Sequence, residues 1–153
     1  MPLDRPRVGR TSNSTRAGSA SLPAVRKDDG RQLARLRRLC LSIPRTIEKL
    51  SHGEPTFFTP KRVFAMFANN HHADGHVAVW LPAAPGVQDA LVEEAPSIYF
   101  RPPYVGGAGW IGVELSQVDD DQLGALIREA HQVITAKDRK AGTLKRPRQH
   151  KAQ

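Results

Sequence analysis

Cysteine is nearly absent from this sequence of 153 residues, which contains Cys40 alone. A single cysteine excludes an internal disulfide and any metal site built from several cysteines. Long apolar runs are missing too, so no segment has the length of a membrane-spanning helix. The N-terminus lacks the hydrophobic segment of a secretory signal. We therefore expect a cytoplasmic protein with no membrane partner, in which Cys40 is a buried and inert thiol.

Aromatic residues are also scarce, at 6% of the chain, and hydrophobic residues make up 39%, so the core should be small. The formal net charge is +8, which usually indicates a polyanionic partner. This charge is unevenly distributed. Residues 1–27 contain six basic residues and one acidic residue, residues 137–153 contain seven and one, and residues 28–136 contain ten and thirteen. The foldable part is therefore mildly acidic, and the two ends hold the positive charge.

Both ends are predicted to be disordered. Residues 1–27 are rich in Ser, Gly, Pro and Arg, and apolar spacing stops after Lys137. Such segments bury too little apolar surface to offset the entropy of ordering. An organelle transit peptide is an alternative interpretation of the first end. We therefore divide the chain into a disordered basic tail over residues 1–27, one domain over 28–136, and a second disordered basic tail over 137–153.

A first helix is predicted between Asp28 and Pro44. Asp28 and Asp29 are typical N-cap residues, and the residue before a proline is pushed out of the helical region. Apolar residues recur at helical spacing and should form one face: Leu33, Leu36, Leu39 and Cys40. Arginines fall mostly on the opposite face, which we interpret either as a solvated surface or as a phosphate-contacting surface: Arg31, Arg35, Arg37 and Arg38.

The remaining pattern predicts strands at residues 56–58, 62–68, 76–81 and 110–115, with helices at 87–94 and from Asp119 onward. Residues 46–50 are expected to be a link or a helical turn. Asp74-Gly75 lies between two strands and is a hairpin signal. In the strand at 76–81, alternation places Val77, Val79 and Leu81 toward the core and leaves His76 and Trp80 on a more open face. This order predicts a two-layer α+β fold, with an antiparallel sheet of about four to five strands and helices packed on one face.

Four segments carry a family resemblance. Residues 51–58 (SHGEPTFF), 70–75 (NHHADG), 100–106 (FRPPYVG) and 109–113 (GWIGV) resemble, in this order, segments of the MmcQ/YjbR-like family. The resemblance covers about residues 30–137 and implies a compact fold related to the frataxin-like (CyaY-like) arrangement. Members of the family are often labelled DNA-binding. The chain departs from the usual pattern at Gly107-Ala108, where a proline and a larger residue are commoner, and it adds the basic tails.

Histidines gather near the predicted hairpin and are the candidate metal ligands. The candidates are His71, His72, Asp74 and His76. Adjacent histidines in an extended segment point apart, and the spacing matches no established zinc pattern. We expect a hydrogen-bonded loop here, with no metal and no other cofactor.

Catalytic motifs are missing from the sequence. It has no nucleophile elbow, and the glycines at 106–109 precede a strand rather than a phosphate-binding helix. The pairs that would serve as acid and base are His52 with Glu54, or His71 with Asp74. We expect a non-enzymatic protein.

Two binding functions remain. The first is DNA binding through the basic first helix and the basic tails, with these contact residues: Arg31, Arg35, Arg37, Arg38 and Arg62. The second is a small-molecule- or protein-binding module that uses a polar and aromatic patch. The patch residues are His52, Glu54, His71, His72, Asp74, Trp80, Arg101, Tyr104 and Trp110.

Overall fold

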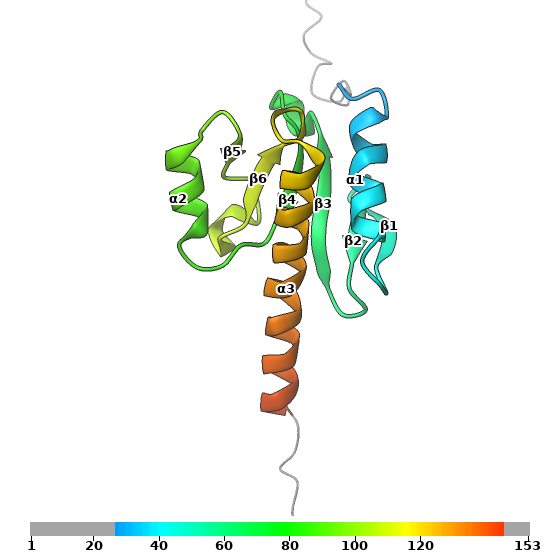
Figure 1. The fold of residues 1–153 in the computed structure, drawn as a ribbon, viewed down its shortest axis with the longest axis vertical. Coiled ribbons are helices and arrows are strands. Elements are labelled where there is room, and N and C mark those ends of the chain that lie inside the picture. Colours follow the sequence, from blue (N-terminus) through cyan, green and yellow to red (C-terminus); the bar gives the residue numbers. More distant parts are fainter. Residues whose placement is uncertain (1–26, 146–153) are drawn as a thin grey trace, which may run out of the picture.

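The computed structural model describes residues 27–145, and these form one sheet and three helices (Figure 1). The predictions for residues 1–26 and 146–153 lie outside the described residues. In chain order the elements are α1 (Arg31–Leu41), β1 (Ile47–Ser51), β2 (Glu54–Phe58), β3 (Val63–Asn69), β4 (Val77–Leu81), α2 (Val87–Glu94), β5 (Tyr99–Phe100), β6 (Ile111–Glu114) and α3 (Asp120–Lys145). Three short 3-10 turns connect them: η2 (His71–Ala73), η3 (Gly106–Ala108) and η4 (Leu115–Gln117).

The sheet has six strands in the order β1-β2-β3-β4-β6-β5, and every neighbouring pair is antiparallel. The α+β class is therefore confirmed, although the expected four to five strands were too few. Two strands were not predicted from the sequence: the two-residue β5, and β1, which occupies the residues expected as a link. Its apolar residues Ile47 and Leu50 are 47% and 74% exposed. An edge strand that is held mainly by main-chain hydrogen bonds need not bury one of its faces, so its sequence lacks the apolar alternation that predicts a strand.

A tight hairpin joins β1 to β2. Its two loop residues, His52 and Gly53, have φ angles of 54° and 83°, as a type I′ turn requires. The predicted hairpin around Asp74-Gly75 is confirmed as the β3–β4 connection, where Met66 pairs with Trp80 and Asn69 with Val77.

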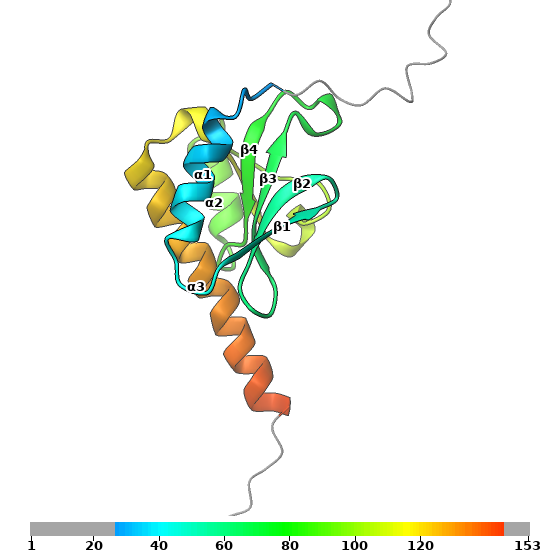
Figure 2. The same ribbon diagram turned by 90° about the vertical axis from the view of Figure 1, so that its right-hand side faces the viewer.

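The three helices lie on one side of the sheet, which leaves the other side without a helix (Figure 2). The main core fills the space between the helices and the sheet. It is built from α1 and α3 and from the inward residues of the central strands. The predicted alternation in β4 is confirmed, since Val79 and Leu81 are fully buried in this core and Val77 packs against it. The same alternation sends Ala78 and Trp80 to the other face.

Helix α1 is amphipathic as predicted. Leu36 and Cys40 are fully buried, and Leu33 and Leu39 pack against the core from its margin. The Asp28 carboxylate accepts hydrogen bonds from the amides of Gln32 and Leu33, so it caps the helix start. Burial raises the pKa of the Cys40 thiol, which disfavours the reactive thiolate form.

Helix α3 starts with a reciprocal capping pair, because Asp119 and Gln122 exchange hydrogen bonds between side chain and amide. Its buried apolar side chains are Leu123, Ile127, Ala130 and Ile134. Among the residues described, no helix combines the length and apolar character needed to cross a bilayer.

The predicted disorder of residues 137–145 is wrong, because α3 continues to Lys145, past the end of the sheet (Figure 2). Lysine, arginine, alanine and leucine favour helix. The packed first half of α3 nucleates the helix, and extending an existing helix is much less costly than starting one. An ion pair also ties this part of the helix to the sheet, since Arg62 Nε lies 2.6 Å from Asp138 Oδ1. The domain boundary expected at residue 136 therefore falls inside a helix.

Candidate functional site

The helix-free face of the sheet has a hydrophobic cluster of its own, which we call the second cluster. Its buried members are Ala68, Ala78, Trp80 and Trp110, and Met66, Phe100 and Val105 pack against them. These residues alternate with the main-core residues along β3, β4 and β6. The sheet is thus apolar on both faces, although helices cover only one of them. An apolar face without a helical cover is a common setting for ligand binding.

A partly open cavity of about 770 Å³ lies on this face. Its lining comes from the β1–β2 hairpin, from β3 and β4, from the loop of residues 70–76 between them, which we call the histidine loop, and from the segment before η3. The residues are Ser51, His52, Glu54, Thr56, Met66, Phe67, Ala68, His71, His72, Trp80, Tyr104 and Val105. The lining surface is mainly apolar, and the volume lies within the range of about 300–1,000 Å³ that is usual for small-molecule sites.

Six of the nine predicted patch residues line this cavity: His52, Glu54, His71, His72, Trp80 and Tyr104. The other three lie elsewhere. Asp74 accepts a hydrogen bond from the His76 amide, and Arg101 forms an exposed ion pair with Asp89 at 2.6 Å. Trp110 is 7% exposed and packs in the second cluster beside the cavity.

Aromatic side chains form one wall of the cavity. The ring of His71 lies 4.1 Å from that of His72, 5.3 Å from Trp80 and 5.7 Å from Tyr104, measured between centroids. His72 Nε2 is hydrogen-bonded to the Tyr104 hydroxyl at 3.0 Å. Residues 32 positions apart in the chain are thereby brought together over the buried indole of Trp80. Two of the four rings, those of His71 and His72, come from the segment that the sequence predicted as a hydrogen-bonded loop.

Left-handed backbone is concentrated around the cavity. Tyr104 has a φ of 64°, and the chain turns there. Six non-glycine residues of the described chain have a positive φ. Five of them lie in the cavity lining or next to it: His52, Asn70, His72, Ala73 and Tyr104. The sixth, Arg45, lies away from the cavity. Such conformations cost about 1–3 kcal/mol each and occur preferentially at functional sites.

Hydrogen bonds fix the histidine loop in this conformation. The Asn70 side-chain oxygen accepts from the Gly75 amide at 2.8 Å, and the Asp74 carboxylate accepts from the His76 amide at 2.9 Å. The prediction of a hydrogen-bonded loop is therefore confirmed. The consequence for the site is that His71 and His72 are held in defined positions against the cavity.

Two buried polar atoms in the lining have no hydrogen-bond partner: Nε1 of Trp80 and Nε2 of His71. An unpaired buried donor or acceptor costs about 1–3 kcal/mol. Burial lowers the pKa of His71, and His72 lowers it further, whereas Asp74 and Glu54 act in the opposite direction. His71 is therefore neutral near pH 7, because a histidine with an ordinary pKa is already mostly neutral there.

The four candidate metal ligands do not converge. His76 Nδ1 lies 2.6 Å from the Glu114 carboxylate, and its ring stacks on Phe100 with centroids 3.9 Å apart. Asp74 bonds the loop backbone, while His71 and His72 face the cavity. Within residues 27–145, no group of three or more His, Cys, Asp or Glu side chains is placed to hold a metal ion.

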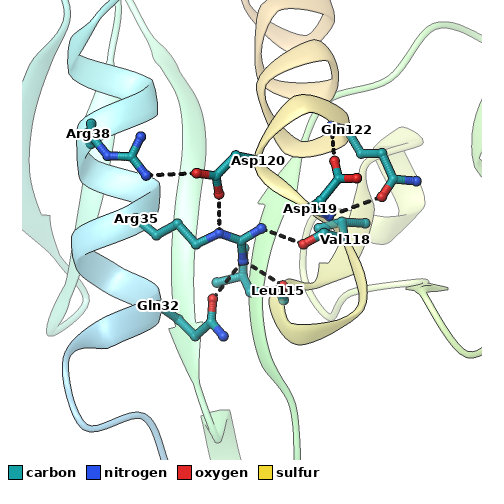
Figure 3. A network of polar contacts seen from close by, with 8 residues as sticks. All are labelled: Gln32, Arg35, Arg38, Leu115, Val118, Asp119, Asp120 and Gln122. Carbon is teal, nitrogen blue, oxygen red and sulfur yellow. Dashed lines mark hydrogen bonds and ion pairs between the residues drawn. The ribbon is translucent and has the colours of Figure 1, made fainter.

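The arginines predicted to contact DNA have carboxylate partners inside the domain. Arg35 has the most extensive contacts: its guanidinium donates to Asp120, to the side chain of Gln32 and to the carbonyls of Leu115 and Val118 (Figure 3). Arg38 donates to the other oxygen of Asp120 at 2.9 Å. These hydrogen bonds lower the pKa of the Asp120 carboxyl, with Arg35 as the larger cause. Arg35 therefore joins α1 to the turn before α3.

The other arginines predicted to contact DNA also lie next to acidic side chains. Arg37 binds both oxygens of Glu48 at 2.8 Å and lowers the pKa of that carboxyl. Arg62 pairs with Asp138, and Arg31 lies 3.9 Å from Asp29 with a side chain that is 80% exposed. Basic side chains that are far apart and paired with acidic side chains attract a phosphate backbone less than their number implies.

Comparison with known proteins establishes the family. The model of the YjbR family matches residues 41–133, which is more than half of the chain. The chain belongs to the YjbR family. The match covers the whole sheet from β1 to β6 and most of the buried part of α3, so the cavity lies within the part of the chain that defines the YjbR domain. No curated protein and no solved structure matches the chain. The frataxin-like arrangement therefore stays a prediction.

Sequence reasoning missed the floor of the cavity in this YjbR domain. Thr56, Met66 and Ala68 were not predicted as site residues, although all three line it. Thr56 pairs with Met66, Met66 pairs with Trp80, and Ala68 lies two residues further along β3 on the same face. Alternation from Trp80 across the predicted strands would have placed them there if the register had been known.

Proposed function

We propose that this YjbR domain is a non-enzymatic binding module that takes a small organic molecule in the cavity on the helix-free face of its sheet. The observation that carries the proposal is the cavity itself, with about 770 Å³ of mainly apolar space and a rigid aromatic wall. Preformed apolar cavities with a few polar groups are the usual form of a ligand site. The cytoplasm is the compartment that we propose.

Strain and unpaired atoms support this proposal. Positive φ angles at His52, His72 and Tyr104 cost free energy, as does the unpaired Nε1 of Trp80. A ligand with an acceptor in reach of the indole nitrogen would recover part of that cost. We propose binding rather than catalysis because the sequence has no nucleophile motif and the Cys40 thiol is buried in the main core, on the opposite side of the sheet.

The first prediction tests the cavity with a chemically diverse fragment library. Binders should shift the amide NMR signals of Ser51, His71 and Trp80, and Tyr104→Ala should weaken binding about tenfold or more, because the aromatic wall then lacks one ring and the hydroxyl that holds His72. The matched control is Leu50→Ala. Leu50 and Tyr104 are both 74% exposed, but Leu50 does not line the cavity. Shifts confined to other surfaces, or equal effects of the two substitutions, would contradict the proposal.

DNA binding is the second candidate function, and the charge distribution favours it. Seven of the last seventeen residues are basic, and Lys137 and Lys140 are exposed on α3. The partners of Arg35, Arg37 and Arg38 reduce the support for α1 as the contact surface. We therefore propose the end of α3 and the tails as the main DNA contact.

The second prediction concerns salt dependence of duplex DNA affinity. For the full chain, the logarithm of affinity should fall with the logarithm of salt concentration, and Lys137→Gln with Lys140→Gln should reduce the slope by about 0.9 for each phosphate that is no longer neutralised. Arg31→Gln on α1 is the matched control and should leave the slope unchanged. A larger change of the slope for Arg31→Gln would indicate that α1 is the main DNA contact. Absence of binding at low salt would remove this candidate function.

A further inference from the structure

A second hollow of the domain is lined by basic side chains, and we call it the basic groove. It has a volume of about 260 Å³ and lies where the link between α1 and β1, the turn between β2 and β3, and helix α3 meet. It shares no lining residue with the cavity described above. The basic groove is therefore a separate candidate site.

Positive charge dominates the lining of the basic groove. Arg45, Lys61 and Arg139 contribute three cations, and Asp138 contributes the only carboxylate among the described lining residues. Arg62, just outside the lining, already pairs with that carboxylate at 2.6 Å. The groove therefore attracts an anion, although residues 28–136 as a whole are mildly acidic.

Two of the lining cations, Arg45 and Lys61, are exposed and have no carboxylate partner in the part of the chain that the structure describes. The arginines of α1 differ, because each of them lies next to a carboxylate. Arg139 has another interaction within the chain, so it adds charge but is not counted among the ligand contacts. Arg45 and Lys61 are the groups that can bind an anion here.

Ordered turns position both of these residues at the groove. The Thr59 hydroxyl oxygen accepts hydrogen bonds from the amides of Lys61 and Arg62 at 3.1 and 3.0 Å. Arg45 has a φ of 67°, a left-handed conformation that is unfavourable for a residue with a Cβ atom and that occurs preferentially at functional sites. A backbone that is fixed before binding reduces the entropy lost when a ligand binds.

The size and chemistry of the basic groove fit a phosphate group. Its volume of about 260 Å³ falls below the usual range of about 300–1,000 Å³ for drug-sized ligands. A guanidinium group binds phosphate oxygens through two parallel N–H groups, and an ammonium group adds a compact positive charge. We propose that the basic groove binds a phosphate group through the Arg45 guanidinium and the Lys61 ammonium group. A small phosphorylated molecule and the backbone of DNA share this chemistry.

The third prediction uses inorganic phosphate titrated into the full chain at pH 7.5 and followed by amide NMR shifts, with sodium chloride of equal ionic strength as the reference. We expect saturable shifts at Arg45, Lys61 and Thr135, which line the groove. Arg45→Gln and Lys61→Gln should each weaken phosphate binding about tenfold, because each removes one of the two cationic contacts.

The matched control is Arg31→Gln, which makes the same change in charge at an exposed position outside the groove and should leave the affinity unchanged. Shifts no larger than those with chloride, or equal weakening by Arg31→Gln and Lys61→Gln, would overturn the inference. Neither result would affect the proposed function of the cavity, because the two sites share no lining residue. If Arg45→Gln fails to fold, Lys61→Gln still decides the question.

Two further probes distinguish the sources of the phosphate group. They are adenosine 5′-monophosphate and a short DNA duplex. Competition of the nucleotide with inorganic phosphate, together with a duplex affinity that Arg45→Gln and Lys61→Gln leave unchanged, would assign the groove to a small phosphorylated molecule. A decrease of about 0.9 in the salt slope of duplex binding for each variant would assign it to a phosphate of the DNA backbone.

Discussion

Replacement of Arg35 by alanine is expected to lower the free energy of unfolding by about 2–4 kcal/mol. The side chain is only 17% exposed, and it donates hydrogen bonds to Asp120 and to the carbonyls of Leu115 and Val118 (Figure 3). Alanine would leave these acceptors without their donor and would uncouple α1 from the start of α3. Denaturant unfolding of the variant and the unchanged chain measures the effect.

Arg31→Ala is the control, because Arg31 lies on the same helix and is 80% exposed. It should change the free energy of unfolding by less than about 0.5 kcal/mol. Arg35→Lys should be intermediate, since lysine keeps the charge but lacks the planar fork that reaches several acceptors. Equal stabilities of the Arg31→Ala and Arg35→Ala variants would show that the network contributes nothing.

The same network has a pH signature with a defined sign. The pKa of Asp120 is lowered in the folded state, so its stabilising contribution is present above the unfolded pKa and is lost as pH falls through the folded pKa. Arg35→Ala removes the larger cause of that shift. The variant should therefore show a weaker loss of stability on acidification than the unchanged chain.

A second large effect is expected from Gly112→Ala, which should cost about 1–3 kcal/mol through overpacking. A Cβ atom at this position would lie 2.4 Å from Cζ of Phe100, far inside contact distance. Phe100 cannot move without a loss of stability, because its ring stacks on His76 and packs in the second cluster. Thermal unfolding measures this loss, and the NMR signals of the His76 ring report any displacement of Phe100.

Gly107→Ala is the matched control, since a Cβ there meets no atom within 4 Å. A double variant of Gly112→Ala with Phe100→Ala provides the sharper test. If the steric account is correct, the two losses of stability should be less than additive, because Phe100→Ala removes the ring with which the new methyl group collides. Strict additivity would contradict it.

The fold was largely predictable because most elements carry a periodic apolar pattern. The stripe of α1, the alternation in β4 and the start of α3 next to Asp119 each depend on local sequence, and each is found where it was expected. The errors occur where the local pattern carries no information. Strand β1 exposes its apolar residues at the sheet edge, and the end of α3 is helical without apolar spacing.

The candidate site was predictable only in part, for a physical reason. His52, Glu54, His71, His72, Trp80 and Tyr104 were selected by residue type, and the fold brings them around one cavity. Met66 and Ala68 are ordinary apolar residues, and strand register alone assigns them to the site. Arg101 and Trp110 were selected by type as well, but an ion pair and burial place them outside the lining.

The separation of the two faces of the sheet has a consequence for how such a domain diversifies. Odd and even positions of β3 and β4 serve different purposes, since Val79 and Leu81 hold the helices while Ala68 and Met66 bound the cavity. Exchanges among apolar residues at the cavity positions reshape the cavity without disturbing the packing of a helix. Under the proposed binding function, ligand selectivity can therefore be altered at these positions independently of the helical layer.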